Sequence, residues 1–429
     1  MKKKYRIILY TSIFLLCVVA SIILVVKKSN SVYEEESKPK VVKHKSMLSM
    51  NLEQTAGAGD YKTVTQSKWP TEGYKFNAEL SRCENGSTLS WDDTKKAVIV
   101  SGNLSDKCYV YFDIYQPTLA EYIKSQYTGT QGENNIYYHD SDLANGAGDN
   151  SYRYAGANPN NFVCFGSDTS PCPTDNLYRI IGVFGENYHG VTGKQLVKLI
   201  KYDYMTTDEL GTDGDYSQTY KEWGMDSTYK GTYGDGERIG VYYWNYKATG
   251  SATNTWSTSL LNKTNLNTNF INNIGTTWAN KIATVTWKVG GNTYANISQS
   301  VPATTYQNEI VNPVTTNTTD NATTYSAKIG LMYVSDYGFA ASPDAWTLTM
   351  SSYNNTTATN NNWMYMGLYE WTISRSAGNS RRAFSVGYGG GVDGDDVDDG
   401  SGVRASFSLE SSVSYVSGSG SMSDPIVIN

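Results

Sequence analysis

Few side chains in this chain of 429 residues are suited to acid–base or nucleophilic chemistry at neutral pH. Only three histidines occur, and apart from His44 they are His139 and His189, each in a polar stretch that predicts an exposed loop. A histidine-based triad or a histidine-rich metal site is therefore hard to assemble. His139 beside Asp140 could belong to a hydrolytic site, but a solvated loop histidine is the simpler interpretation.

The five cysteines favour disulfides over catalysis or metal binding. Cys17 lies in an apolar run, and the other four are Cys83, Cys108, Cys164 and Cys172. Four cysteines allow three pairings, and the local sequence favours 83–108 and 164–172, with four free buried thiols as the alternative. No CxxC motif or nearby histidine supports a metal site. Such disulfides are typical of an exported domain, and they would leave no exterior thiol nucleophile.

The segment 381–401, RRAFSVGYGGGVDGDDVDDGS, contains five aspartates that could ligate calcium. The EF-hand order of acids fails from every starting residue, because Arg404 or Phe407 would fall at the last position. Gly389 to Gly394 match G-x-G-x-x-G formally, but acids and glycines follow instead of a helix, so a pyrophosphate would meet repulsion. We therefore expect no cofactor and keep calcium as an alternative.

The same segment has a second pattern, in which hydrophobic residues punctuate residues drawn almost wholly from Arg, Gly, Tyr, Asp and Ser. The hydrophobic positions are Phe384, Val386, Val392 and Val397. The five other types are among those reached when the adenines of an Asn codon are replaced. We predict that the displayed, ligand-binding face consists of Arg381, Arg382, Gly387, Tyr388, Gly389, Asp393, Asp395, Asp396, Asp398 and Asp399. An inert, turn-rich loop is the competing interpretation, because Asp and Gly are common turn formers.

The elements that must position this segment form an α+β pattern with irregular, aromatic-rich connections. A capping box of Thr118 and Glu121 predicts a helix to about Tyr127. A hairpin is predicted from 178–184 and 195–201, and the stretch 131–161 is predicted as a loop. Further strands are expected at 282–288, 329–334, 368–374, 383–388, 403–410 and 425–428, and helices at 257–274 and from Ser335. Eight of the ten tryptophans follow residue 220, and we expect most of them in the core.

An apolar run at 5–26 is long enough to cross the ~30 Å hydrocarbon core of a bilayer as a helix. Positive charges crowd its N-terminal flank, which predicts that residues 1–4 form a cytoplasmic tail. A cleaved signal peptide is the alternative, but its apolar region is usually only ~7–15 residues long. We therefore expect a single-pass protein of the cell membrane, with the lipid bilayer as a partner and the C-terminal domain outside the cell.

Beyond the anchor we predict a polar stalk at 27–67, a small disulfide-linked β element at 68–115 and a large domain at 116–429. Within the small element, 97–100 and 108–113 are expected to be strands. The first 50 residues carry ten Lys/Arg and three Asp/Glu, which leaves 25 and 38 for the rest and a net charge of −13 there. An acidic exterior domain argues against nucleic-acid binding, which needs clustered Lys and Arg.

Several motifs of the large domain form a recognisable set. They are CFGSDTSPC (164–172), NLYRIIGVFG (176–185), KIGLMYVSDYGFA (328–340), LYEWTISRS (368–376) and GVRASFSLESSV (402–413). Together they resemble a family of membrane-anchored bacterial surface proteins whose C-terminal halves look like the C-type-lectin-like fold shared with formylglycine-generating enzymes. The resemblance implies a fold and a surface location. It does not carry over formylglycine generation, since no cysteine follows Cys172, nor calcium-dependent sugar binding, since the Glu-Pro-Asn and Trp-Asn-Asp signatures do not occur.

The resemblance also gives the codon pattern a meaning. In some C-type-lectin-like proteins, an adenine-specific retroelement diversifies Asn positions in a C-terminal loop, and 381–401 is similar to such a variable region. This implies a membrane-anchored binding or adhesion protein that presents 381–401 to an extracellular protein or glycan, without catalytic activity. The alternative is a surface glycan hydrolase that uses Asp and Glu for acid–base work.

Overall fold

The computed structural model describes residues 48–429, except 66–67, 71–72, 224–227, 235 and 315–321. The predicted cytoplasmic tail, the predicted membrane anchor and the first part of the predicted stalk lie outside the described residues. Among the residues that are described, no helix combines the length and the apolar character needed to span a bilayer. The chain divides into two compact units, Met1–Gln116 and Pro117–Asn429.

The smaller unit is built on a five-stranded sheet in the order β2-β1-β7-β3, with β4 also paired to β7. Its strands are β1 (Leu48–Glu53), β2 (Tyr61–Val64), β3 (Tyr74–Phe76), β4 (Arg82–Cys83) and β7 (Cys108–Ile114), and β5 (Thr88–Asp92) pairs with β6 (Ala97–Ser101). The two strands predicted here are confirmed. The stalk prediction is wrong for β1 and β2, because Met50 and Leu52 pack into the same small core as Val110 and Phe112.

Both predicted disulfides are confirmed. Cys83 and Cys108 face each other across the antiparallel β4–β7 pair, with their Cα atoms 4.0 Å apart. Cys164 and Cys172 close a short loop of the larger unit, with a Cα separation of 5.8 Å. Each unit therefore contains one covalent staple, as is common in exported domains.

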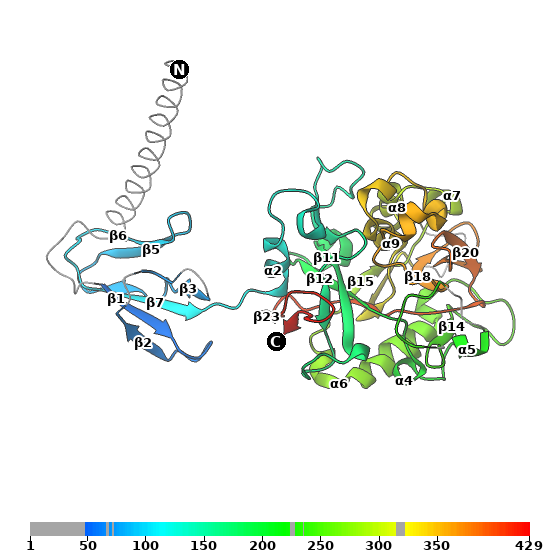
Figure 1. The fold of residues 1–429 in the computed structure, drawn as a ribbon, viewed down its shortest axis with the longest axis horizontal. Helices are drawn as coiled ribbons and strands as arrows, with labels where there is room; N and C mark the ends of the chain where they lie inside the picture. The colour runs from blue at the N-terminus through cyan, green and yellow to red at the C-terminus, as the bar shows by residue number, and fades with distance from the viewer. Residues whose placement is uncertain (1–47, 66–67, 71–72, 224–227, 235, 315–321) are drawn as a thin grey trace, which may run out of the picture. The chain divides into compact units, whose positions relative to one another are not determined.

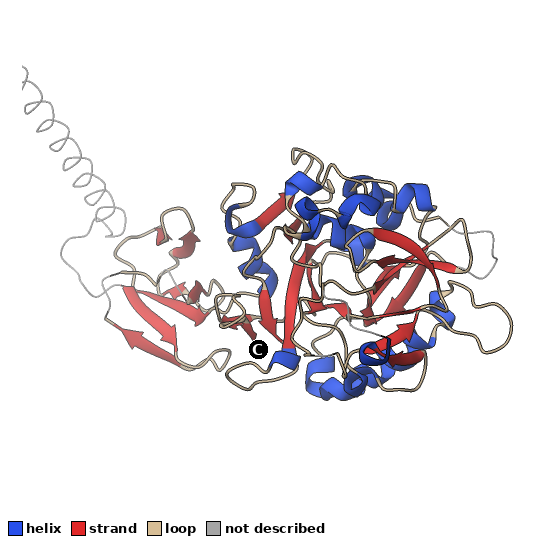
Figure 2. Ribbon diagram, turned by 45° about the vertical axis from the view of Figure 1, so that its right-hand side comes forward, coloured by secondary structure: helices blue, strands red, loops and turns tan. Residues whose placement is uncertain are grey.

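The larger unit has a seven-stranded sheet in the order β17-β22-β12-β11-β9-β8, with β10 also paired to β11. The strands are β8 (Ile136–His139), β9 (Ser151–Tyr154), β10 (Phe162–Cys164), β11 (Leu177–Phe184), β12 (Leu196–Lys201), β17 (Ile329–Gly330) and β22 (Ser406–Ser408). The predicted β11–β12 hairpin is confirmed as an antiparallel pair. Every residue of both strands is buried, because helices and loops cover both faces of the sheet (Figures 1 and 2).

The prediction of a continuous loop at 131–161 is wrong, because this stretch contains β8 and β9, which pair with each other. Each strand has only four residues, and the residues between them are rich in Asp, Asn and Gly. Asn145 and Asn150 adopt positive φ values in that connection, as asparagine does more readily than most residues. The turn chemistry was visible in the sequence, but it hid the two short strands beside it.

The other elements of the larger unit complete an α+β fold, as predicted. The smaller sheets consist of β13 (Tyr216–Thr219), β14 (Gly240–Tyr243) and β21 (Gly400–Ser401); β15 (Val285–Lys288) and β16 (Thr324–Ala327); β18 (Glu370–Arg375), β19 (Arg382–Val386) and β20 (Val392–Asp396); and β23 (Tyr415–Ser417) and β24 (Val427–Ile428). The α-helices are α2 (Leu119–Ser125), α3 (Glu186–His189), α4 (Thr207–Leu210), α5 (Tyr220–Trp223), α6 (Ile271–Ala279), α7 (Tyr294–Ile297), α8 (Pro302–Tyr306), α9 (Val334–Ala340) and α10 (Thr356–Thr359). Two π-helical segments, η4 (Leu261–Phe270) and η5 (Gln307–Val311), precede α6 and follow α8.

Several helix predictions are also confirmed. The predicted capping box starts α2, since the Thr118 side chain accepts a hydrogen bond from the Glu121 N–H and the Glu121 carboxylate accepts one from the Thr118 N–H. Helical structure at 257–274 is present as η4 and the first residues of α6, and the short helix expected from Ser335 is α9. Helices α7, α8 and α9 lie on one side of the larger unit and α4 and α6 on the other (Figure 1).

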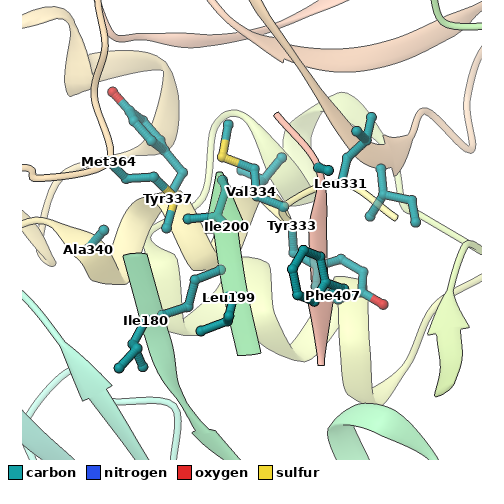
Figure 3. Packing of buried hydrophobic residues seen from close by; sticks show 14 of the residues in the cluster. Ile180, Leu199, Ile200, Leu331, Tyr333, Val334, Tyr337, Ala340, Met364 and Phe407 are labelled. Atoms are coloured by element: carbon teal, nitrogen blue, oxygen red, sulfur yellow. The ribbon is translucent and has the colours of Figure 1, made fainter. Parts of the chain in front are cut away.

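The core of the larger unit lies where the central sheet meets α9. Figure 3 shows Ile180, Leu199 and Ile200 of β11 and β12 beside Phe407 of β22, with Val334, Tyr337 and Ala340 of α9 packed nearby. The prediction that most tryptophans are core anchors is confirmed, because seven of those after residue 220 are buried: Trp244, Trp256, Trp278, Trp287, Trp346, Trp363 and Trp371.

Buried cations among aromatic rings are the second feature of this core. Arg153, Arg179, Lys198 and Arg404 are all nearly inaccessible to solvent. The Arg153 guanidinium lies 4.8 to 5.7 Å from the centroids of four aromatic rings, and Arg179 lies between Phe162 and Trp363. Such rings attract a desolvated cation through their negative faces. Many of the chain's 35 tyrosines are therefore buried in a core that also contains charged groups, and others lie on the surface.

The two ends of the larger unit meet. The Leu119 N–H donates to the Val413 carbonyl at 2.8 Å, and the Tyr415 N–H donates to the Pro117 carbonyl at 2.9 Å. The rings of Tyr122 and Tyr415 stack at 3.7 Å between centroids. In Figure 1 this junction, at α2 and β23, lies at the opposite end of the larger unit from β18 and β20.

Candidate functional site

The segment 381–401 forms a β-hairpin, not an extended loop. Strands β19 and β20 pair in the register Arg382↔Asp396 and Val386↔Val392, and β19 also pairs with β18. After β20 the chain joins a second sheet, where β21 pairs with β14. Strand β20 was not predicted, because Asp and Gly are depleted in strands. It is an edge strand of its sheet, and charged side chains on an edge discourage pairing with other chains.

Exposure along the hairpin separates the candidate ligand-binding positions from the residues between them. Five candidate positions are exposed, namely Arg381, Arg382, Tyr388, Asp393 and Asp399. The other five are partly exposed, namely Gly387, Gly389, Asp395, Asp396 and Asp398. The four intervening hydrophobic residues have at most 2% of their surface exposed: Phe384, Val386, Val392 and Val397. The segment thus has an outer set of residues that reaches solvent and an inner set that belongs to the core.

The glycines of the hairpin turn also differ, in the space that surrounds each of them. Gly390 has φ +94°, and a Cβ there would lie 2.6 Å from Thr359 Cγ2 and 2.9 Å from the Tyr353 carbonyl oxygen. At Gly389 the nearest atom to an added Cβ would be 3.9 Å away, and at Gly387 it would be 3.4 Å away. Gly390, which is not a candidate position, is thus required by the turn, whereas Gly387 and Gly389 leave room for other side chains.

Ion pairs join the charged residues at the open end of the hairpin. Arg382 Nε lies 3.3 Å from Asp396 Oδ1, and Arg381 Nη2 lies 3.5 Å from Asp398 Oδ2. All four side chains are a third to a half exposed, and surface pairs of this kind contribute at most about 1 kcal/mol. The pairs therefore organise the charged surface without preventing either partner from contacting a ligand.

Two carboxylates of the hairpin, those of Asp395 and Asp399, have raised pKa values. Burial raises the pKa of Asp395, and the negative charges of Asp393 and Asp399 raise it further, while the Ser385 hydroxyl donates a hydrogen bond to this carboxylate. Burial and the neighbouring Asp396 raise the pKa of Asp399. In the described part of the chain, no three His, Cys, Asp or Glu side chains are grouped so that they could hold a metal ion. The calcium alternative gains no support from these residues.

Tyr388 lies at the turn, away from the charged end. Its side chain is 46% exposed, its ring contacts that of Tyr369 at 5.4 Å between centroids, and its carbonyl accepts a hydrogen bond of 2.5 Å from the Tyr365 hydroxyl. Strand β19 (Arg382–Val386) lies between Tyr388 and Arg381 and spans roughly 13 Å, at about 3.3 Å for each of its four residue steps. The structure therefore places the candidate residues along one hairpin instead of around a single point.

A pocket of about 430 Å³ opens beside the charged end of the hairpin. The hairpin contributes Arg382, Phe384 and Gly394 to its wall. The remaining wall comes from the loop before β19 and from α7 with its flanking residues, namely Ser376, Gly378, Asn379, Thr293, Tyr294, Ala295 and Gln299. The volume is within the usual range for small-molecule sites. Sequence reasoning missed the wall residues outside the hairpin, because they precede it by up to about 90 residues and form no motif.

A second group that the sequence did not indicate is a pair of tyrosines beside β21. Tyr243 of β14 is paired with Gly400, and the Asn245 N–H donates to the Val397 carbonyl at 3.0 Å. The Tyr243 ring stacks on that of Tyr246 at 4.7 Å between centroids, and Tyr246 is among the most exposed large side chains described. Both tyrosines thus border the C-terminal end of the candidate surface.

The expectation of exposed loop histidines is wrong. His139 is fully buried at the end of β8, where its Nδ1 accepts a hydrogen bond from the Ala147 N–H and its ring contacts Phe339 and Trp346. Burial holds the pKa of His139 well below its usual range and also lowers that of His189. Both histidines are thus buried and neutral at physiological pH. The polar residues around them belong to turns that cover the rings, which is why the sequence suggested exposure.

Comparisons with protein-family models, with curated proteins and with solved structures find nothing that matches this chain. The case for function therefore depends on the hairpin, its neighbours and the sequence pattern.

Proposed function

We propose that the protein is a membrane-anchored extracellular binding or adhesion protein of the bacterial cell surface, with 381–401 as a diversified ligand-binding surface on a C-type-lectin-like scaffold. One observation carries the proposal. The ten candidate positions all reach solvent at least in part, whereas the four hydrophobic positions between them are buried in the core. Substitution of the outer set changes the surface and leaves the packing intact, which is the physical requirement for a variable binding site.

The hairpin suits recognition of a protein or a glycan. Tyr388, Arg381 and Arg382 are exposed, and Tyr and Arg are the usual anchors of protein interfaces. Four of the outer residues, Arg382, Asp393, Asp395 and Asp396, lie on the paired strands β19 and β20, so little conformational entropy is lost there when a ligand binds. The adjoining pocket, with its hydroxyl, amide and aromatic groups, offers a place for one residue or sugar unit of a larger ligand.

Two features support the extracellular, tethered location. The apolar run at 5–26 suits a single membrane span, and the two disulfides are typical of an oxidising compartment. Within the larger unit, β20 lies at the end opposite to α2, the first helix after the unit begins (Figure 1). A surface in that place is directed away from the chain's entry point.

The test compares substitutions of outer and inner residues. We expect the triple variant Arg381→Asn, Tyr388→Asn, Asp393→Asn to shift Tm by no more than roughly 4 °C, since exposed positions rarely cost more than about 0.5 kcal/mol each. Its binding profile on a protein and glycan array should change. Val392→Asn, the matched inner variant, should unfold at a clearly lower temperature because it buries an unpaired amide. Array binding that is identical in the triple variant and the unmodified protein would contradict the proposal.

The glycan hydrolase stays the alternative. The described residues that line the pocket include no carboxylate, so acid–base groups would have to come from elsewhere in the molecule. Sugar release by the purified protein, abolished by a single Asp or Glu substitution, would favour the hydrolase. A search of the genome for a near-copy of this segment with Asn codons and for a reverse transcriptase gene tests diversification independently.

A further inference from the structure

Three buried polar groups meet between the central sheet and α9, far from the hairpin in sequence. Lys198 of β12 and Asp336 of α9 each have about 1% of their surface exposed, and Tyr188 of α3 is also buried. Lys198 Nζ lies 2.6 Å from Asp336 Oδ2 and donates a hydrogen bond of 3.0 Å to the Tyr188 hydroxyl oxygen. The Tyr188 hydroxyl in turn donates to Asp336 Oδ1. The amine, the carboxyl group and the phenol thus form a closed ring of contacts.

The surroundings of these three groups are aromatic and buried. Lys198 Nζ lies 4.4 to 5.0 Å from the ring centroids of Tyr188, Trp287 and Tyr333. Burial lowers the pKa of Lys198 in spite of the nearby Asp336 carboxylate. Burial also raises the pKa of Tyr188 well above its usual value, so the phenol keeps its proton as a donor. Burial of both partners also removes the water that would otherwise solvate the Lys198 ammonium.

We propose that Lys198 and Asp336 condense to an intramolecular isopeptide bond, with Tyr188 as the proton relay. The reacting groups are held together in the folded chain, and such positioning of reactants is worth several orders of magnitude in rate. Exclusion of water from the site favours the amide, because water is the leaving group and hydrolysis is the reverse reaction. This inference does not depend on the proposed binding function.

The contacts define each step. The Lys198 ammonium gives one proton through the Tyr188 hydroxyl to Asp336 Oδ1, which leaves an amine and a carboxylic acid. The amine lone pair forms the Nζ–Cγ bond, and charge develops on Oδ2, which accepts a hydrogen bond of 2.9 Å from the Tyr333 N–H. A second Nζ proton passes through Tyr188 to Oδ1. The Cγ–Oδ1 bond then breaks, and Oδ1 leaves as water with two of the three ammonium protons.

The chain contains a matched control for this chemistry. Lys201, also fully buried, lies 2.7 Å from Glu209 Oε1, so it too is an amine beside a carboxylate. The other oxygen of Glu209 accepts hydrogen bonds from the Thr206 N–H and the Thr206 hydroxyl. Among the described residues no hydrogen bond connects a phenol to both members of this pair. We therefore expect Lys201 and Glu209 to remain unlinked.

Mass spectrometry of the purified full-length chain tests the proposal. After reduction and alkylation, the intact mass should be lower by one water than the mass calculated for the fully alkylated sequence. A protease that cleaves after lysine should fail at Lys198, and a branched peptide should join Lys198 to Asp336, whereas the peptides with Lys201 and Glu209 should be separate. Recovery of the full mass of the alkylated sequence, with unlinked peptides for Lys198 and Asp336, overturns the proposal.

Tyr188→Phe tests the relay separately. This change removes only the hydroxyl, so the ring packing is kept, and loss of a proton-transfer group typically slows a reaction by at least 100-fold. We expect most of the purified Tyr188→Phe protein to retain the full mass, with a circular dichroism spectrum like that of the unmodified chain. A folded Tyr188→Phe variant that is linked to the same extent as the unmodified chain would overturn the assignment of Tyr188.

Discussion

Among the buried acids, Glu309 has the most pronounced effect on how the stability of the fold depends on pH. Its carboxylate accepts hydrogen bonds from the Val334 and Ser335 N–H groups, at 2.8 and 2.9 Å, and from the Ser374 hydroxyl. Burial nevertheless raises the pKa of Glu309 to about 7. The carboxyl group therefore holds its proton in the folded chain over a pH range in which it is ionised in the unfolded chain.

This pKa predicts that stability decreases as the pH rises. Below about pH 4.5 both states are protonated, and between pH 4.5 and 7 only the unfolded state releases the proton, so up to about 3 kcal/mol of stability is lost over that window. Glu309→Gln should flatten the dependence of the unfolding free energy on pH between 5 and 7. Asp168→Asn, at an exposed acid of the same unit, serves as the control. If the unfolding free energy of the unmodified protein and that of Glu309→Gln change equally with pH between 5 and 7, Glu309 does not titrate in this range.

The turn glycines give a second prediction at the residue scale. Gly390→Ala should destabilise the larger unit by at least about 1–2 kcal/mol, because an L-residue is strained at positive φ, and the added methyl group would also clash with Thr359. Gly389→Ala should change the unfolding free energy by less than about 0.5 kcal/mol, because its surroundings are open. Thermal or urea unfolding of the two variants checks this. Equal losses of unfolding free energy in Gly390→Ala and Gly389→Ala would contradict this prediction.

At the scale of elements, the two disulfides should differ in their effect. Cys83–Cys108 closes a separation of 25 residues and Cys164–Cys172 one of 8. Loop-closure entropy then gives about 3.5 kcal/mol for the first and about 2.5 kcal/mol for the second. The double variant Cys83→Ser, Cys108→Ser should therefore unfold the smaller unit first, since its core is small. Calorimetry should show an early transition for this unit, and a single transition at the original temperature would contradict the prediction.

The elements that could be predicted from the sequence are those with a strong local signal. The capping box at Thr118 and the long apolar runs of β11 and β12 are such cases, and the four cysteines paired as their spacing suggested. Strands β8, β9 and β20 were missed because Asp, Asn and Gly dominate their surroundings, and the pairing that holds them is not visible in a short window. The pocket was missed for the same reason, since Tyr294 and Asn379 meet only through the tertiary fold.

The candidate surface was predictable in part. Its inner residues, such as Phe384 and Val392, follow from hydrophobicity, and the outer residues follow from their composition. The histidines were misplaced, because a polar sequence around His139 is compatible both with exposure and with a buried ring covered by turns. Burial of an ionisable group depends on the segments that pack over it, and these segments are distant in the sequence.

At the scale of the whole molecule, the larger unit is closed by its own C-terminal residues. The Cys164 N–H donates to the Ile426 carbonyl and the Ile426 N–H donates to the Phe162 carbonyl, both at 2.9 Å, so the end of the chain forms a parallel bridge to β10 of the central sheet. Ile426 and Ile428 are buried. The last residues thus hold α2 and β10 together, although they are remote from the hairpin (Figure 1).

Removal of residues 414–429 should therefore destabilise the larger unit without touching the candidate surface. Loss of Ile426 and Ile428 alone exposes apolar area worth at least about 3 kcal/mol, and the stacking partner of Tyr122 is lost as well. Removal of residues 48–63 is the matched control, because it takes β1 and most of β2 from the smaller unit only. Hydrogen exchange should show faster exchange in β10 and β11 after the C-terminal deletion and unchanged exchange there after the control. If β10 and β11 exchange equally slowly in both, the C-terminal strand is an appendage and not the closure of the fold.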